Sequence, residues 1–176
     1  ALCSQLYGCS KPLSSGDEPI LYLGQVCSVL KFHAIFKLME GLFLPDHFDI
    51  HRILEKLSTV GATSAKILNE GYRKLLLEEA ESYTYKPEDK VVGTGDKIVR
   101  QQMSSFEDFT GDSKYILLKH SFQSLLDEYL TLIEPYPFET RLTFNSAVLQ
   151  RYEKGSIGIT PHRDGLSYIN LVCLFI

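Results

Sequence analysis

The stretch "LQRYEKGSIGITPHRDGLSYINLVCLFI" at residues 149–176 decides how the chain is interpreted. It joins strand-forming segments through a turn at "EKGS", and it contains "PHRD" at residues 161–164. Side chains two positions apart on an extended strand point to the same side. His162 and Asp164 would therefore project together, and Arg163 would point away. An imidazole and a carboxylate at one point are two of the three ligands in a 2-His-1-carboxylate iron site.

The surroundings of this triplet strengthen the metal interpretation. A His-x-Asp triplet alone is more often a solvated surface pair than a metal site. Here Pro161 fixes the approach of the chain, and a long apolar strand follows. Gln150 and Tyr152 share one face of the preceding strand, where a simple hydrophobic core would not favour polar side chains. The pattern therefore favours a ligand-binding face over a plain core.

The rest of the chain predicts helices before strands. Apolar residues at helical spacing predict helices over about residues 46–60, 64–83 and 113–133. Residues 84–96 predict a loop with at most one short strand, "KIVRQQM" predicts a strand, and residues 142–152 predict a longer one. This order predicts an α+β fold. The buried stripe of the second helix is expected to contain Leu68, Tyr72, Leu75, Leu76 and Ala80.

Length and composition indicate one ordinary globular domain. The chain has 176 residues, of which 44% are hydrophobic and 23% charged, and its net charge is −4. That charge does not favour a nucleic-acid partner, which usually requires a basic face. Residues 1–18 show no periodicity, and we treat residues 1–40 as an unassigned leader. Residues 41–176 are expected to hold the helical support and the beginning of a β-domain.

Neither a membrane segment nor an export signal is predicted. Lys31, His33, Lys37 and Glu40 interrupt the apolar residues 19–44, and the first ten residues contain no Lys or Arg. The cysteines form no C-x-x-C pair and fit no zinc or disulfide framework, so free thiols in a reducing compartment are favoured. These observations predict a cytoplasmic protein. The cysteines are Cys3, Cys9, Cys27 and Cys173.

The segment "NSAVLQRYEKGSIGITPHRDGLSYINLVCLFI" resembles the first half of the double-stranded β-helix, or jelly roll, of Fe(II)/2-oxoglutarate-dependent dioxygenases. It is most similar to the AlkB-like and related branches. The resemblance implies that His162 and Asp164 are the first two iron ligands and that the Tyr152 hydroxyl contacts 2-oxoglutarate. Gln150 stands where the AlkB-like pattern has Asn, and the spacing from Tyr152 to His162 is one residue longer. The implied reaction is hydroxylation or oxidative demethylation of a substrate that the sequence does not identify.

The family pattern also requires a distal His and a basic residue that binds 2-oxoglutarate. Only 12 residues follow Asp164, and none of them is His, Arg or Lys. We therefore expect a truncated β-domain and a fragment that does not turn over alone. Two alternatives stay open. One is a non-catalytic, cupin-like module that binds metal or another ligand, and the other is a structural interaction domain in which "HRD" is a surface turn.

Other candidate motifs have simpler explanations. His47 and His51 have the spacing of a zinc-protease pair, but Phe48 stands where that motif has its Glu, so they are interpreted as surface histidines. Arg151 and Arg163 would allow contact with a nucleic-acid backbone, but a rim or salt-bridge role is favoured. "GDS" at residues 111–113 indicates a helix start. Three acidic residues of the second helix are expected to be solvated: Glu78, Glu79 and Glu81.

Overall fold

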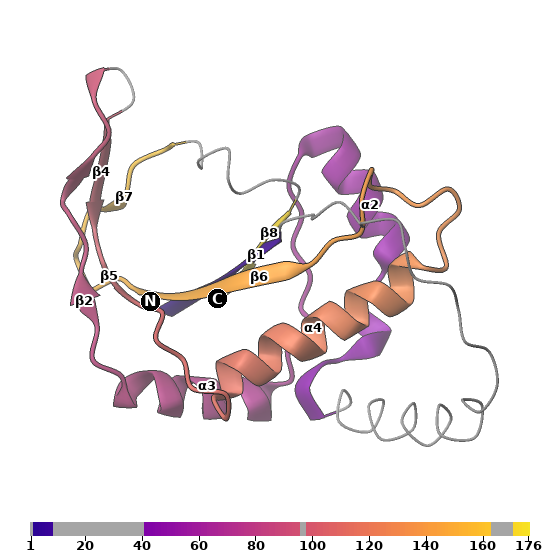
Figure 1. Cartoon of the computed structure of the whole chain (residues 1–176), viewed down its shortest axis with the longest axis horizontal. Coiled ribbons are helices and arrows are strands. Elements are labelled where there is room, and N and C mark those ends of the chain that lie inside the picture. The colour runs from indigo at the N-terminus through magenta and orange to yellow at the C-terminus, as the bar shows by residue number, and fades with distance from the viewer. Residues whose placement is uncertain (1, 9–40, 96–97, 163–170) are drawn as a thin grey trace, which may run out of the picture.

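A computed structural model of the chain describes residues 2–8, 41–95, 98–162 and 171–176, with the backbone alone described for residues 2–8. These residues form three α-helices and two small antiparallel sheets (Figure 1), so the predicted mixture of helices and strands is confirmed. The helices are α2 (Ile50–Val60), α3 (Glu70–Ser82) and α4 (Lys114–Leu130), with a 3₁₀ turn, η1 (Pro45–His47), before α2. The strands are β1 (Leu2–Gly8), β2 (Lys86–Pro87), β3 (Val91–Val92), β4 (Val99–Gln102), β5 (Ser104–Phe106), β6 (Phe144–Arg151), β7 (Gly158–Ile159) and β8 (Val172–Phe175).

Helix α2 begins later than residue 46 because a different residue caps it. The side chain of Asp49 accepts a hydrogen bond from the backbone N–H of Arg52 at 3.0 Å. Pro45 begins the short 3₁₀ turn instead. The helix ends as predicted at Gly61, whose φ of +79° is a conformation that glycine adopts without steric cost.

Helix α3 is shorter at its start than the predicted 64–83. Residues 62–69 are not helical, because part of their backbone pairs with the segment before η1. The Leu44 N–H donates to the Ile67 carbonyl at 2.6 Å, and the Asn69 N–H donates to the Leu42 carbonyl at 2.7 Å. Asn69 then caps the helix. Leu75, expected in the buried stripe, is 42% exposed, whereas Tyr72, Leu76 and Ala80 are buried as predicted.

Helix α4 forms the centre of the hydrophobic core. Its start matches the predicted one, because the Ser113 side chain accepts from the Tyr115 N–H at 3.1 Å. Its buried face includes Leu118 and Leu125, each 1% exposed. Phe122 packs against Phe144 of β6 with ring centroids 5.7 Å apart. Figure 1 shows α3 and α4 together on one side of β6.

The first sheet has the strand order β2-β5-β6-β1-β8. We expected no regular structure in residues 1–18, yet β1 pairs antiparallel with β6 over Leu2–Gly8 and with β8 on its other side. The stretch "LCSQLYG" has little β-branched or aromatic character, so pairing with distant strands decides its conformation. The prediction that strands follow all helices is therefore wrong.

The second sheet has the order β3-β4-β7 and shares one hairpin with the first. Strand β2 pairs with β5, β3 pairs with β4, and only Met103 separates β4 from β5. This bent hairpin passes from one sheet to the other and extends away from α3 (Figure 1). The described strands form two open sheets and not a closed barrel.

The two faces of β6 have different roles. Leu149 is 1% exposed and belongs to the core with Leu76 and Leu118, so its face is turned to the helices. Tyr7 pairs with Ser146, but the next residue of β1, Gly8, pairs with Phe144. The register therefore shifts between them and leaves one extra residue in β6. Such a bulge allows Phe144 to pack on the same helical side as Leu149. Gln150 alternates with Leu149 and lies on the opposite face, as predicted.

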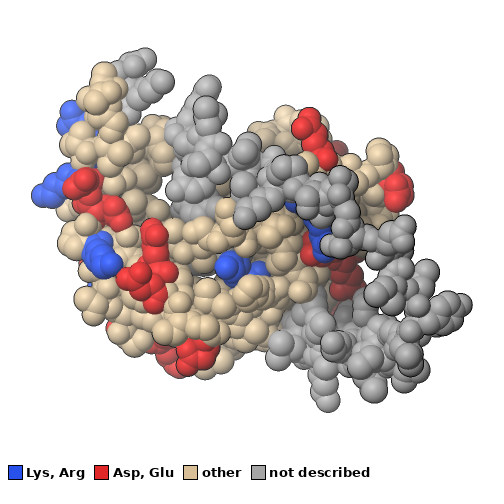
Figure 2. All heavy atoms as spheres, in the orientation of Figure 1, with Lys and Arg blue, Asp and Glu red and all other residues tan. Residues whose placement is uncertain are grey.

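Charges are mixed on the surface. Figure 2 shows acidic and basic side chains interspersed on the face it presents, without a broad basic area. Arg141 and Asp127 form an ion pair at 2.8 Å, and Lys86 and Asp108 form one at 3.1 Å. Cys173 is a free thiol, and burial raises its pKa to about 12, so it is unreactive at neutral pH. The side chains of the other cysteines lie outside the described residues.

Candidate functional site

Polar side chains collect on the face of β6 that is turned away from the helices. The Tyr152 hydroxyl donates a hydrogen bond to the Gln150 side-chain oxygen at 3.1 Å. Both residues are half-buried. The alternation of the strand predicts these two side chains on one face, and their contact confirms that placement. As phenol and amide, they offer donors and acceptors to a bound ligand.

Strand β5 adds two polar groups that the sequence did not indicate. Ser105 pairs directly with Gln150 across the two strands, so its side chain shares the same face. Ser105 is only 8% exposed, and its hydroxyl donates to the Glu88 carboxylate. Ser105 belongs to the three-residue strand β5, and Glu88 follows the two-residue strand β2. The positions of such short strands depend on pairing and not on a local sequence pattern. We call Glu88, Ser105, Gln150 and Tyr152 the polar row.

His162 follows β7 and is positioned by that strand's contact with β4. The Thr160 N–H donates to the Arg100 carbonyl at 2.9 Å, and the Arg100 N–H donates to the Thr160 hydroxyl at 2.9 Å. The expectation that His162 lies on a strand is wrong. Regular pairing ends before it, and Pro161 has no N–H with which to continue the ladder.

The His162 ring has an orientation that suits a metal ligand. Its Nδ1 lies 2.9 Å from the Thr160 carbonyl oxygen. A carbonyl can only accept, so Nδ1 carries the hydrogen, and Nε2 carries the lone pair when the ring is neutral. Metal-binding histidines commonly hold their second nitrogen in this way. The imidazole is exposed at the surface.

The second predicted iron ligand, Asp164, lies outside the described residues, as does Arg163. Within residues 41–95, 98–162 and 171–176, no three His, Cys, Asp or Glu side chains converge on one point. The other described histidines lie in η1, α2 and α4 and are exposed: His47, His51 and His120. His47 and His51 therefore belong to different elements, which agrees with their interpretation as surface residues.

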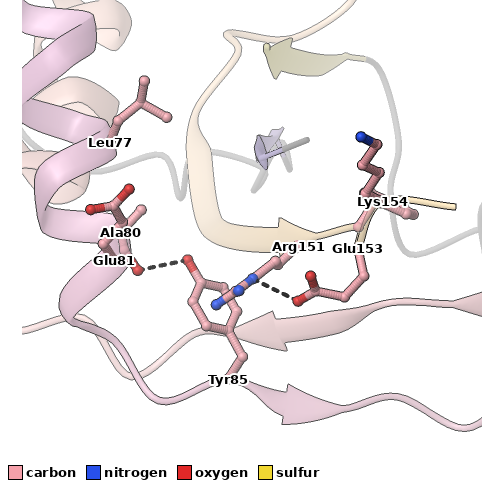
Figure 3. Close-up of a pocket in the computed structure, with 8 residues that line it drawn as sticks. Leu77, Ala80, Glu81, Tyr85, Arg151, Glu153 and Lys154 are labelled. Atoms are coloured by element: carbon pink, nitrogen blue, oxygen red, sulfur yellow. Dashed lines mark hydrogen bonds and ion pairs between the residues drawn. The ribbon is translucent and has the colours of Figure 1, made fainter. Parts of the chain in front are cut away.

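A pocket of about 600 Å³ lies between the C-terminal half of α3 and the chain that follows β6 (Figure 3). Leu77 and Ala80 of α3 line one side, and Tyr152 also borders the pocket. The Arg151 guanidinium lies over the Tyr85 ring, 5.5 Å from its centroid. Its Nε forms an ion pair with Glu153 at 2.9 Å, which confirms the salt-bridge role predicted for Arg151.

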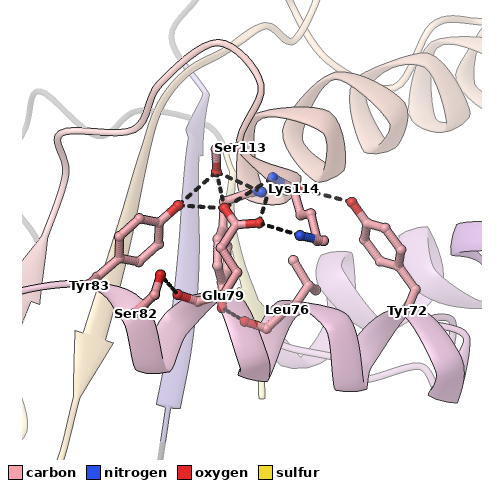
Figure 4. A network of polar contacts seen from close by, with 8 residues as sticks. Tyr72, Leu76, Glu79, Ser82, Tyr83, Ser113 and Lys114 are labelled. Carbon is pink, nitrogen blue, oxygen red and sulfur yellow. Dashed lines mark hydrogen bonds and ion pairs between the residues drawn. The ribbon is translucent and has the colours of Figure 1, made fainter.

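A second polar cluster joins α3 to α4 and centres on Glu79 (Figure 4). The Glu79 carboxylate accepts hydrogen bonds from the Tyr83 hydroxyl, from Ser113 Oγ at 2.7 Å, and from the Lys114 N–H at 3.1 Å. Its side chain is only 13% exposed, so the expectation of a solvated Glu79 is wrong. The sequence could not show this, because residues 79 and 113 meet only when the two helices pack together.

The electrostatics of this cluster indicate a structural role. Burial raises the pKa of Glu79, but the hydrogen bonds from Tyr83, Ser113 and Lys114 outweigh burial and hold the pKa below its usual value. The carboxylate is therefore charged at neutral pH and completes the cap of α4. Burial, together with the nearby Glu79 charge, raises the pKa of Tyr72 to about 12. The Tyr72 hydroxyl donates to the Lys114 carbonyl at 2.8 Å and adds a second link between the helices.

Comparisons with protein-family models, with curated proteins and with solved structures found no match to this chain. Among the described residues, no helix is both long and apolar enough to cross a membrane. The features of the molecule that bear on its function are therefore the polar row, His162 and the pocket beside Tyr152.

Proposed function

We propose that this chain is part of an Fe(II)/2-oxoglutarate-dependent dioxygenase in which His162 and Asp164 supply two iron ligands. The observation that carries the proposal is the division of β6 into two faces. Leu149 faces the helices, and Gln150 lies on the opposite face, where its side-chain oxygen accepts a hydrogen bond from the Tyr152 hydroxyl. A ligand-binding face with helical support behind it is what the sequence resemblance implies for this strand.

The residues present fit an iron site in their chemistry. The lone pair on Nε2 of His162 and a carboxylate from Asp164 are ligands that Fe(II) accepts in oxygenases. Tyr152 and Gln150 would contact the cosubstrate through their hydroxyl and amide groups. Iron, when bound, would supply the activation of O₂ that is coupled to decarboxylation of 2-oxoglutarate. The third iron ligand, the basic residue for 2-oxoglutarate and the substrate are not assigned.

Metal binding by two histidine variants tests the proposal. Fe(II) affinity is measured anaerobically by titration calorimetry for the wild type, for His162→Ala and for the control His120→Ala. Both histidines are exposed, so neither change should unfold the chain. We expect His162→Ala to weaken Fe(II) binding by about tenfold or more, and His120→Ala to leave it unchanged. Equal affinities in the two variants would remove His162 from the site and favour a structural domain.

A second measurement separates an oxygenase from a module that only binds metal. Because the chain is not expected to turn over alone, binding of 2-oxoglutarate is measured anaerobically, with and without Fe(II), in the wild type and in Tyr152→Phe. An oxygenase site binds 2-oxoglutarate in an Fe(II)-dependent way, and more weakly without the tyrosine hydroxyl. Tight Fe(II) binding that depends on His162, without any binding of 2-oxoglutarate, would favour the cupin-like module instead.

A further inference from the structure

The pocket beside Tyr152 has opposite charges on its two sides. On the helix side lie Glu81 and the C-terminal end of α3, where the helix dipole adds partial negative charge. On the other side lie Arg151, the last residue of β6, and Lys154, which follows that strand. Figure 3 shows Glu81 and Lys154 on opposite sides of the pocket. With Glu153, the lining has two cationic and two anionic side chains, and its formal charge is zero.

Of these four charged side chains, Arg151 and Glu153 pair with each other, and Glu81 and Lys154 are available to a ligand. The Nε of Arg151 pairs with Glu153, and the stacking on Tyr85 fixes the guanidinium plane. The terminal nitrogens of such a fixed guanidinium can still donate to an oxyanion. Within the described part of the chain, neither Glu81 nor Lys154 forms an ion pair with another residue. A ligand could therefore supply the partner for each of them.

The remaining lining suits an apolar or aromatic body. Leu77 supplies aliphatic surface, and Tyr85 supplies an aromatic ring at the same pocket. The volume of about 600 Å³ lies within the range of small-molecule sites in proteins. Glu81 and Lys154 are both exposed, so a ligand with a single charge would contact one of them and leave the other to solvent, whereas a zwitterion would contact both.

We propose that this pocket binds a small zwitterion, namely an α-amino acid with an apolar or aromatic side chain. Its ammonium group contacts Glu81 and the end of α3, and its carboxylate contacts Lys154 and the terminal nitrogens of Arg151. Its side chain lies on Leu77 and beside the Tyr85 ring. This inference goes beyond the proposed oxygenase function and does not depend on iron binding.

Three probes that differ only in charge test the inference: L-phenylalanine, 3-phenylpropionate, which lacks the ammonium, and 2-phenylethylamine, which lacks the carboxylate. Binding to the full chain is measured by NMR titration in EDTA, so the result is independent of any iron site. We expect L-phenylalanine to bind at least about threefold more tightly than either analogue, as expected for partly exposed charge pairs.

Matched charge variants locate the contacts. Lys154→Gln should reduce L-phenylalanine affinity about three- to tenfold, to the level of 2-phenylethylamine, and Glu81→Gln should reduce it to the level of 3-phenylpropionate. Lys56→Gln and Glu78→Gln, at exposed positions outside the pocket, should change nothing. Absence of L-phenylalanine binding to the wild type would overturn the proposal. So would equal binding of the three probes, or equal effects of the pocket and control variants.

Discussion

Replacement of Glu79 offers the most direct test of how the helices are held together. In Glu79→Ala, the Ser113 hydroxyl and the Lys114 N–H lose their acceptor at the start of α4, and the Tyr83 hydroxyl keeps only its contact with Ser113 Oγ at 3.2 Å. These donors lie in a partly buried place, so water replaces the carboxylate incompletely. Glu79→Gln keeps the shape of the side chain and one acceptor oxygen but removes the charge.

The expected loss of stability follows from these contacts. A hydrogen bond to a charged group contributes about 1.5–3 kcal/mol, and bonds that share one acceptor do not add fully. The Lys114 ammonium is 40% exposed, so solvent screening makes its ion pair a small part of the total. We expect Glu79→Ala to lower the free energy of unfolding by about 3 kcal/mol and Glu79→Gln by about 1–2 kcal/mol.

Urea denaturation followed by circular dichroism measures these changes, with Glu78→Gln as the control. Glu78 is the preceding residue on α3 and is exposed, so its replacement should change stability by less than about 0.5 kcal/mol. The slope of unfolding free energy against urea should stay constant among the variants. Equal stabilities of the Glu78 and Glu79 variants would refute the assigned role of the carboxylate.

Three further predictions concern pH, the core and a helix end. The pKa of Glu79 is lower in the folded chain, so the stabilisation that its carboxylate provides is complete above the ordinary pKa of 4.5 and is lost as the pH falls through the lowered value. In Glu79→Gln, the free energy of unfolding should therefore depend less steeply on pH in the acid range than in the wild type. Leu149→Ala should cost about 2–5 kcal/mol in urea denaturation, because Leu149 is 1% exposed, whereas Leu132→Ala, at 76% exposure, should cost little. Gly61→Ala should lower the free energy of unfolding, measured by thermal denaturation, by about 1 kcal/mol, because Gly61 has a φ of +79°. Gly111 has no positive φ, so Gly111→Ala should not lower it.

Local pattern was sufficient for the elements whose signals lie within one segment. The start of α4 at Ser113, the end of α2 at Gly61 and the length of β6 follow from capping residues and periodicity. The beginning of α3 did not follow, because the pairing of Phe43 with Leu68 competes with helix formation there. Propensity is a weak guide where tertiary pairing satisfies the same backbone groups.

The candidate site was predictable in part for the same reason. The contact between Gln150 and Tyr152 follows from the alternation of one strand. Ser105 and Glu88 join them through pairing between strands that are only two or three residues long, and such strands have no periodic signal. The pocket between Glu81 and Lys154 combines residues about 70 positions apart, so no local motif could indicate it.

The position of β1 between β6 and β8 has a consequence for the order of folding. Residue Ser4 pairs with Leu149 on one side and with Phe175 on the other, so both neighbours of β1 are synthesised long after β1 itself. On a ribosome, β1 would wait for almost the whole described chain before either partner emerged. Contacts of such long sequence separation slow folding and prolong the exposure of unpaired strands. The yield of folded protein, at low temperature or with chaperones, should therefore depend on the sequence of β1 more than on the sequence of any helix.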